Sequence, residues 1–262
     1  MIWIAGFLAC ATGQAADRDL APYFQGLKGT FVLYDSAKRS YVRYNPARAG
    51  ERLSPCSTYK IPNSLIGLET GVVRDAAFVI PYDAKRDPQQ PGWNPAWPRD
   101  HDLRSAFRFS VVWYYQEVAR RVGAERMKKF VHQFGYGNED TSGGIDRFWL
   151  GRSLLISADE QVAFLQRFYE ERLGVSARTT GIVKDIMLAD QGAGWKLSAK
   201  TGACRGDKAE AVVWYVGFVE KAGNVFYFAL NLGGQDMDKL IPLRITKARE
   251  ILEGLGVIEA RK

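Results

Sequence analysis

Histidine and cysteine are both scarce in this chain of 262 residues. The two histidines, His101 and His132, lie in no recognisable catalytic motif, so a Ser-His-Asp triad is a poor candidate. The three cysteines and the two histidines are scattered, without the close spacing that zinc ligands show. We therefore expect no metal site, and a serine nucleophile here would need a base other than histidine.

Long apolar runs and long basic runs are also missing. No stretch approaches the ~20 apolar residues of a membrane-spanning helix, so we expect no integral membrane segment. The net charge is +7, yet the sequence has neither a block of basic residues nor an aromatic-basic RNA-binding motif. We expect no nucleic-acid partner and interpret the charge as a solvated surface.

The first residues have features of an export signal. Residues 2–11 form a short apolar run, and Gly13 and Ala15 are the small residues expected at positions −3 and −1 of a cleavage site. The usual basic residues before the run are absent, so a simple apolar terminus is the alternative. We favour a signal-peptide remnant over residues 1–16 and a periplasmic or secreted protein. Cys56 and Cys204 then remain as an even pair, which makes them candidates for a disulfide.

Alternating patterns typical of strands occupy both ends of the chain, and helical patterns occupy its middle. Strands are expected over residues 30–34, 41–44, 196–201, 212–219 and 225–232. Helices are expected over residues 19–27, 111–122, 127–134 and 243–253. A capping box at Ser157 and Glu160 predicts the start of another helix.

This order of elements predicts an α+β protein. We expect one antiparallel sheet formed from the N- and C-terminal strands and flanked by helices, with an all-helical subdomain inserted over roughly residues 60–190. Residues 17–262 would form a single domain. A site would lie in the cleft between the sheet and the inserted helices.

The segment Ser57-Thr58-Tyr59-Lys60 offers a serine nucleophile with a lysine as its base. Because Ser57 and Lys60 are three positions apart, they share one face of a helical turn. Pro55 fits a helix start, which would place Ser57 near the positive end of the helix dipole. Such a pair also arises by chance in a chain of this length, with a capping serine and a surface lysine as the alternative.

Four further motifs follow this segment in order, which makes the pattern specific. They are Ser110-Val111-Val112, Tyr136-Gly137-Asn138, Phe148-Trp149-Leu150 and Lys200-Thr201-Gly202. The set resembles the class D β-lactamases (the oxacillinase family), a branch of the penicillin-recognising serine acylases. The resemblance runs from about Thr30 to the C-terminus. It implies a β-lactamase or penicillin-binding transpeptidase-like fold and hydrolysis of β-lactam antibiotics through a serine acyl-enzyme.

The resemblance implies a role for each matching residue. Ser57 would be the nucleophile, and Lys60 would be its general base after N-carboxylation by carbon dioxide, with no other cofactor. A lysine can react in this way only as the neutral amine, so its pKa must be lowered by a desolvating pocket. Ser110 would pass a proton to the leaving lactam nitrogen. The backbone N–H groups of Ser57 and Ala203 would form the oxyanion hole.

The remaining matches would surround the lysine or bind the substrate. The indole N–H of Trp149 would hydrogen-bond the carbamate. The pocket around it would be formed by Tyr59, Val112 and Leu150. The substrate would be bound by Lys200, Thr201, Gly202 and Arg244, with the guanidinium suited to a carboxylate. Ordinary alternatives are core packing for Val112 and Trp149, a helix N-cap for Ser110 and a solvated side chain for Arg244.

Two features depart from the family pattern. Gly151 stands where an acidic residue is common, so we expect a more mobile loop. Cys56 precedes the nucleophile, and Cys204 lies two residues beyond Gly202, a placement that resembles the disulfide of class A carbapenemases. We therefore expect a Cys56–Cys204 disulfide, with two buried free thiols as the alternative. Our hypothesis is that the bridge rigidifies the acyl pocket and supports turnover of carbapenems as well as penicillins.

Three other functions remain open at this point. A β-lactam sensor would acylate at Ser57 without deacylating, and a penicillin-binding transpeptidase or peptidase would act on cell-wall peptides. A noncatalytic envelope protein would carry the motifs as remnants. We expect a small β-lactam as the partner and a monomer or homodimer as the assembly.

Overall fold

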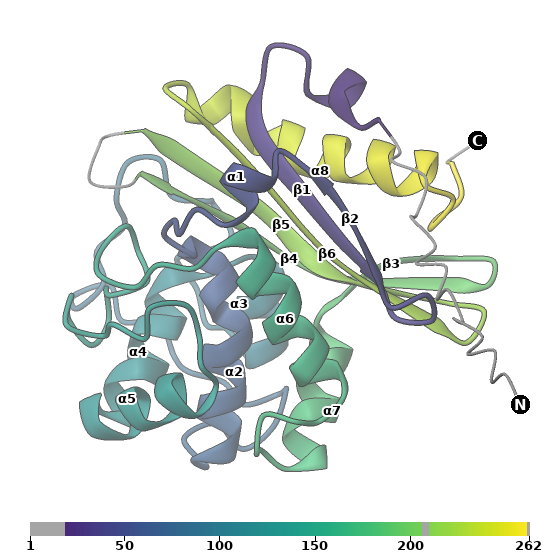
Figure 1. Ribbon diagram of the computed structural model, residues 1–262. Coiled ribbons are helices and arrows are strands. Elements are labelled where there is room, and N and C mark those ends of the chain that lie inside the picture. The colour runs from purple at the N-terminus through teal and green to yellow at the C-terminus, as the bar shows by residue number, and fades with distance from the viewer. Residues whose placement is uncertain (1–18, 206–209, 261–262) are drawn as a thin grey trace, which may run out of the picture.

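One antiparallel sheet with helices on both faces forms the protein in the computed structural model, which describes residues 19–205 and 210–260 (Figure 1). In this part of the chain the strand order is β2-β1-β6-β5-β4-β3. The strands are β1 (Lys28–Asp35), β2 (Ser40–Tyr44), β3 (Leu188–Gly192), β4 (Trp195–Arg205), β5 (Ala211–Lys221) and β6 (Asn224–Gly234). Because β1 pairs with β6, the two ends of the chain meet inside the sheet.

Most of the helices come from the long segment between β2 and β3, and they gather on one side of the sheet, whereas α8 crosses the other side (Figure 1). The helices are η1 (Ala21–Phe24), α1 (Pro46–Ala49), η2 (Cys56–Tyr59), α2 (Lys60–Glu69), α3 (Leu103–Arg108), α4 (Val112–Val122), α5 (Ala124–Gln133), α6 (Ala158–Tyr169), α7 (Ala177–Ile186) and α8 (Met237–Gly254). The α+β fold with inserted helices that the sequence predicts is confirmed.

The sheet separates two apolar cores. Val32 faces the core of the inserted helices, whereas its neighbours Phe31 and Leu33 face the core beneath α8. Successive strand residues point to opposite faces, so a strand between two cores must be apolar at every position. The run from Ala211 to Val219 in β5 is buried throughout for this reason.

Several local predictions are confirmed. Strands β1 and β2 form the predicted hairpin. Strands β5 and β6 form the second, where Ala222 and Gly223 take φ of 49° and 76° in the two-residue turn. Ser157 and Glu160 make both hydrogen bonds of the capping box at the start of α6. Positive φ at both central residues is the geometry that matches the twist of a hairpin.

The structure corrects two predicted helices and adds two elements. The helix expected over residues 19–27 is only the short 3₁₀ turn η1, which is followed by Gly26 at a φ of 71°. The last helix begins at Met237 because Asp236 caps it by accepting the Lys239 N–H, and the helix tolerates Pro242 near its start. Helix α7 and strand β3 were not predicted; β3 is largely exposed and has no alternating pattern. The proposed signal remnant over residues 1–16 lies outside the described residues.

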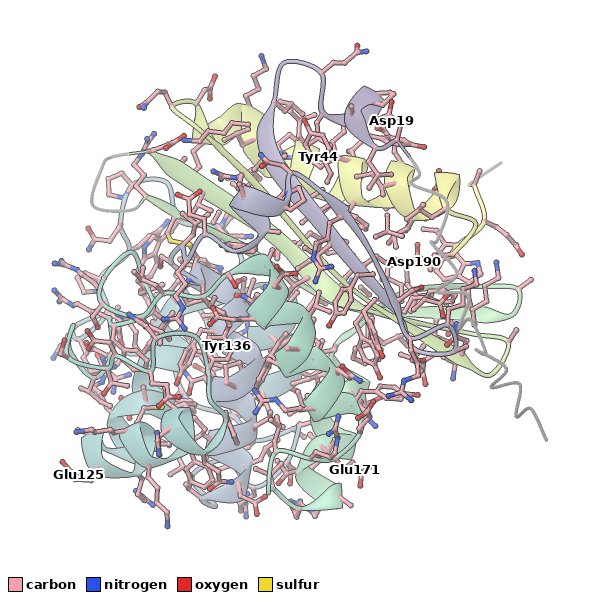
Figure 2. The ribbon with its side chains drawn as sticks, in the orientation of Figure 1. Asp19, Tyr44, Glu125, Tyr136, Glu171 and Asp190 are labelled. Carbon is pink, nitrogen blue, oxygen red and sulfur yellow. A yellow bond between two sulfur atoms is a disulfide. The ribbon has the colours of Figure 1, made fainter. Side chains whose placement is uncertain are left out.

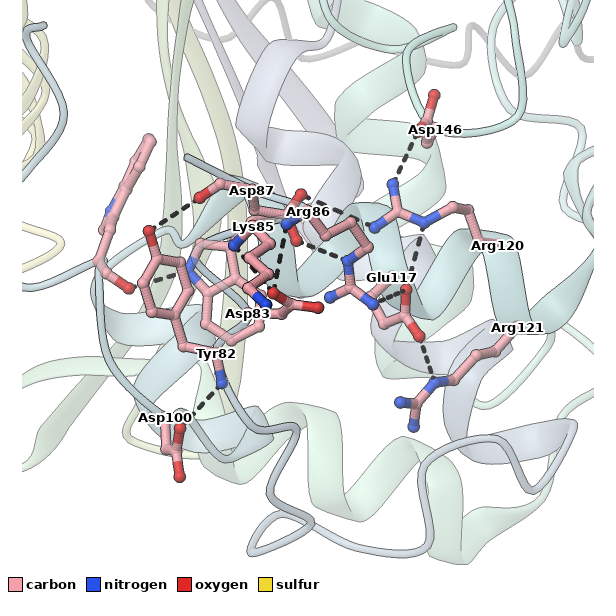
Figure 3. A network of polar contacts seen from close by, with 12 residues as sticks. Tyr82, Asp83, Lys85, Arg86, Asp87, Asp100, Glu117, Arg120, Arg121 and Asp146 are labelled. Carbon is pink, nitrogen blue, oxygen red and sulfur yellow. Dashed lines mark hydrogen bonds and ion pairs between the residues drawn. The ribbon is translucent and has the colours of Figure 1, made fainter. Parts of the chain in front are cut away.

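A network of ion pairs fixes the long segment between α2 and α3 against α4. Glu117 contacts Arg86, Arg120 and Arg121 at 2.7–3.2 Å (Figure 3). Arg120 also donates to Asp146 at 2.8 Å, on the segment that leads to Trp149. The loop, the helix after Ser110 and the segment before Trp149 are therefore joined by shared charges. None of the helices within residues 19–205 and 210–260 combines the length and apolar character of a membrane span.

Candidate active site

Ser57 and Lys60 lie at the junction of a 3₁₀ turn with an α-helix. In η2 the side chains at positions i and i+3 eclipse one another, which brings Lys60 directly over Ser57. The Nζ atom of Lys60 donates to the Oγ atom of Ser57 at 2.9 Å. The sequence prediction that these two groups meet is borne out by this contact.

Lys60 is fully buried, with 0% of its surface exposed. Burial disfavours the charged ammonium and lowers the pKa of Lys60 to about 7. Its Nζ atom lies over the ring of Tyr115, 5.3 Å from the ring centroid. A large fraction of Lys60 is therefore the neutral amine at neutral pH, and only that form can accept a proton or react with carbon dioxide.

Trp149 packs beside the lysine's own segment. Its ring stacks on Tyr59, the residue before Lys60, with centroids 5.3 Å apart, and it meets Phe148 edge-on at 5.0 Å. The indole Nε1 atom is buried and has no hydrogen-bond partner among the described residues. A buried N–H without an acceptor costs about 1–3 kcal/mol, so this group is suited to an additional acceptor. The Tyr59 hydroxyl is occupied by Met127 Sδ at 3.1 Å.

Ser110 has an unusual backbone conformation. Its φ of 57° is left-handed, which is uncommon for a residue other than glycine and is frequent at functional sites. The N-cap of α4 is Val111, without a side-chain cap, so the alternative role of Ser110 as helix N-cap is wrong. A cap residue takes extended backbone angles, which Ser110 does not have. Its hydroxyl makes no hydrogen bond to another described residue.

Strand β4 forms the opposite wall. Its partner β3 ends its pairing at Ser198, so beyond that point β4 has a strand only on its β5 side. Gly202 allows this edge to approach the nucleophile turn, because a Cβ there would lie 2.9 Å from the Pro55 carbonyl oxygen. Cys204 is joined to Cys56 by the predicted disulfide, with Cα atoms 5.6 Å apart (yellow in Figure 2). Ala203 lies between these two contact points.

Two further cations gather near Lys60. Lys200 is 4% exposed, and its Nζ donates to the Thr201 carbonyl and hydroxyl at 3.0 and 3.2 Å. Burial, together with the charges of Lys60 and Arg244, holds the pKa of Lys200 well below its usual value. Arg244 reaches from α8 and donates to the Gly202 carbonyl at 2.9 Å, and burial lowers its pKa to about 10. An anion in this place would relieve the mutual repulsion.

A cavity of about 600 Å³ opens beside Lys200 and Thr201, between α3 and the sheet. Phe107 lines it, with Lys200 Nζ 5.5 Å from its ring centroid. Ser57 and Ser110 lie outside its lining. The cleft predicted between sheet and helices is therefore present along β4. Val112 and Leu150 are half-buried, and their place around Lys60 stays a prediction.

Some contacts that hold the site were not predicted from the sequence, although Asn138 belongs to one of the sequence motifs named above. Gln161 of α6 donates to the Thr58 hydroxyl at 2.8 Å and accepts from Tyr136 at 3.4 Å, so it ties the nucleophile turn to the helices. A polar residue on the apolar stripe of α6 was the available signal. Asn138 makes three hydrogen bonds to the backbone of residues 153–155. Ser54 contacts the Trp149 loop and has no local sequence signal.

Comparison with known proteins identifies the family of this fold and site. The profile of the penicillin binding protein transpeptidase domain matches residues 29–253. β-Lactamase OXA-48 of Klebsiella pneumoniae is 41% identical over 232 residues, which is 88% of this chain and 84% of that protein. β-Lactamase OXA-10 of Pseudomonas aeruginosa is 39% identical over 236 residues, covering 89% and 86%.

Solved structures agree with the sequence matches. The class D β-lactamase YbXI from Nostoc superposes with a TM-score of 0.84 and 38% identity, over 91% of this chain and 98% of that one. FUS-1 (OXA-85) from Fusobacterium nucleatum subsp. polymorphum gives a TM-score of 0.86 with 35% identity, over 92% and 98%. A serine and a neutral lysine on a penicillin-binding transpeptidase fold define a serine acylase. Within that fold the chain belongs to the class D β-lactamases, which confirms the predicted resemblance.

The low pKa of Lys60 predicts a specific effect of pH on stability. Its folded pKa of about 7 lies below the unfolded value of about 10.4, so the unfolded chain binds the extra proton between these values. Lys60→Met should therefore raise the free energy of unfolding most below pH 7, by on the order of 5 kcal/mol. The gain should shrink as pH rises from about 7 towards 10.

Urea unfolding in buffers free of carbon dioxide would measure this difference. Lys196→Met, at an exposed position on β4, is the matched control and should show no such pH dependence. A Lys60→Met effect that is the same at pH 6 and pH 9 would contradict a buried lysine with a lowered pKa.

Proposed function

We propose that this protein hydrolyses β-lactams, with penicillins as its main substrates, through an acyl-enzyme on Ser57. The observation that carries the proposal is the 2.9 Å contact between Ser57 Oγ and the Nζ atom of a fully buried Lys60. Relatives at 39–41% identity bear the name β-lactamase, which supports the substrate class.

In acylation, Lys60 accepts the Ser57 hydroxyl proton while Oγ bonds to the lactam carbonyl carbon. The lactam C–N bond breaks, and the nitrogen receives a proton through Ser110, whose hydroxyl is not engaged in a helix cap. Backbone N–H groups of Ser57 and Ala203 stabilise the oxygen on which charge develops, as in other acyl transfers. The disulfide next to each of these residues supports their approach.

We propose that Lys60 works in its N-carboxylated form. The residues present fit that group, because burial lowers the pKa of Lys60 to about 7, which leaves much of it as the neutral amine at neutral pH. In addition, the Trp149 indole N–H lacks an acceptor among the described residues. When formed, the carbamate supplies an anionic oxygen base beside Ser57. Trp149 would donate a hydrogen bond to it. The side chains of Tyr59, Val112 and Leu150 would exclude bulk water.

Substrate binding relies on the cations of the β4 edge. Lys200, Thr201 and Arg244 would bind the carboxylate that penicillins carry, and Gly202 would let the substrate lie close to the strand. Support comes from the lowered pKa of Lys200, which is caused by burial and by two neighbouring cations. A carboxylate there would compensate this positive charge, and a guanidinium offers it forked geometry.

Deacylation separates a β-lactamase from the other candidate functions. A sensor or a penicillin-binding transpeptidase would stop at, or transfer, the acyl group, and a binding protein would not form it. A base that remains buried next to Ser57 can also take a proton from an incoming water. Membership of the class D family favours hydrolysis over these alternatives.

We further propose that residues 1–16 are an export signal and that residues 17–262 form one domain, a periplasmic or secreted monomer or homodimer with no nucleic-acid partner. The Cys56–Cys204 disulfide supports an oxidising compartment. We also propose that this bridge rigidifies the acyl pocket and extends the substrates to carbapenems.

Bicarbonate should control the activity. Purified protein should hydrolyse a chromogenic cephalosporin with turnover that rises when bicarbonate is added, and Lys60→Ala should lose at least about 1,000-fold in kcat/KM, the effect expected for loss of a general base. Initial rates with and without bicarbonate measure this. A single stoichiometric burst with stable acyl-protein on Ser57 would instead identify a sensor or penicillin-binding protein.

The disulfide should matter for stability and for carbapenems. The double variant Cys56→Ala/Cys204→Ala opens a loop with a sequence separation of 148 residues and should lose up to about 5 kcal/mol of unfolding free energy. We expect kcat/KM for a carbapenem to fall more than kcat/KM for benzylpenicillin. Equal losses for the two substrates would reject the carbapenem proposal while leaving the stability effect intact.

Export should remove the signal. Protein isolated from the periplasm or the medium is expected to begin near residue 17, and N-terminal sequencing would measure this. Intact Met1 on protein that remains in the cytoplasm would contradict the proposed location.

A further inference from the structure

Ser54 lies three residues before the nucleophile and contacts the loop that carries Trp149. Its exposed fraction is 5%. The Oγ atom donates to the Trp149 carbonyl oxygen at 3.1 Å and accepts the Gly151 N–H at 2.9 Å. These two backbone groups lie on either side of Leu150. One hydroxyl therefore fixes the peptide groups from which the side chains of Trp149 and Leu150 project.

Ser54 is itself held firmly. Its carbonyl oxygen accepts a hydrogen bond from Trp214 Nε1 of β5 at 2.9 Å. On one side, Leu53 exchanges two backbone hydrogen bonds with Ile156, at 2.9 and 2.8 Å. On the other side, the chain passes through Pro55 to the Cys56–Cys204 disulfide. Ser54 is thus held in place by the sheet, and its hydroxyl holds the Trp149 loop in place through the two hydrogen bonds.

The loop needs such a support at this point. Gly151 has a φ of 71°, which glycine adopts freely. Because glycine can also adopt many other backbone conformations, the loop would gain freedom if the hydrogen bond of Gly151 were lost. The increase in mobility that we expected from glycine in place of an acidic residue is countered by the bond to Ser54. Stacking on Tyr59 restricts the orientation of the Trp149 ring plane. The position of Nε1 within that plane depends on where the backbone of residue 149 lies.

We propose that Ser54 is a positioning residue that aims the Trp149 indole N–H at the nitrogen end of Lys60 and thereby sets how tightly carboxylated Lys60 is held. The inference rests on the proposed function of Lys60 and Trp149. Ser54 touches neither substrate nor the reacting atoms. Its effect passes through the Trp149 carbonyl and the Gly151 N–H, so it should be lost when the indole N–H is absent.

The test measures carboxylation of Lys60 directly. Protein titrated with ¹³C-bicarbonate is followed by the NMR signal of the carbamate carbon, beside the penicillinase rate at each concentration. Ser54→Ala should weaken the apparent bicarbonate affinity by about tenfold, the lower end of effects seen when a supporting hydrogen bond to a ligand-binding side chain is removed. Saturating bicarbonate should restore most of kcat and leave KM for penicillin equal to that of the unchanged protein, because Lys60 is then carboxylated in both.

Ser153→Ala is the matched control. Ser153 lies in the same loop and makes the same pair of bonds, accepting the Gly143 N–H at 2.9 Å and donating to the Asp140 carbonyl at 2.9 Å. Loss of its hydroxyl should lower thermal stability without changing bicarbonate affinity. Equal shifts in bicarbonate affinity for the two variants would overturn the proposal, because any weakening of the loop would then suffice.

Two further variants separate the possible causes. Ser54→Thr keeps the hydroxyl and should retain bicarbonate affinity; a loss equal to that of alanine would assign the effect to packing and reject the proposal. In the Trp149→Phe background, Ser54→Ala should add little, whereas additive effects would exclude action through the indole. If the unchanged protein gives no carbamate signal and no response to bicarbonate, the proposed form of Lys60 fails before Ser54 is tested.

Discussion

Lys60 is buried without a carboxylate partner among the residues that the structure describes, and the rest of the site depends on this constraint. A buried ammonium with no counter-charge is unfavourable, so the surrounding fold must tolerate either a strained cation or a neutral amine. Burial lowers the pKa of Lys60 to about 7, so the neutral amine is well populated at neutral pH. The free energy of unfolding is lower with lysine here than with an apolar residue, but the lysine supplies a base. Such a group would not persist in a protein whose only requirement was packing.

The base must be buried while its serine stays accessible. Lys60 has no exposed surface, whereas Ser57, three residues earlier, is half-buried. The 3₁₀ turn places the two side chains on one side of the turn, where they touch, and Lys60, which begins the buried helix α2, is enclosed by the core while Ser57 keeps part of its surface exposed. The close approach of β4 at Gly202 then completes the opposite wall. Local geometry therefore brings Lys60 to Ser57, and tertiary packing of β4 encloses the pair.

Features that depend on local spacing could be predicted from the sequence, and features that depend on distant contacts could not. The Ser57–Lys60 contact follows from helical spacing, and the two hairpins follow from alternation and turn residues. Ser54 gave no sequence signal, and Gln161 gave only a polar residue on an apolar stripe, because a buried hydroxyl or amide acquires its partners only when remote segments meet. The alternative role of Ser110 as helix N-cap was wrong for a related reason: its φ of 57° is left-handed, and residue type alone does not reveal this.

The electrostatics of the site couple the charge state of Lys60 to the binding of the substrate carboxylate. Lys200 is destabilised as a cation first by burial and then by the charges of Lys60 and Arg244. Any change that removes positive charge from Lys60 therefore makes Lys200 easier to protonate, which strengthens its attraction for a substrate carboxylate. Conversely, a bound carboxylate stabilises the positively charged forms of nearby lysines. Because binding free energies are reciprocal, the state of Lys60 and the affinity for substrate must depend on one another. The charge on Lys60 is thus coupled to Lys200, which also responds to Arg244, so a change in the charge of the base also changes how firmly the substrate carboxylate is held.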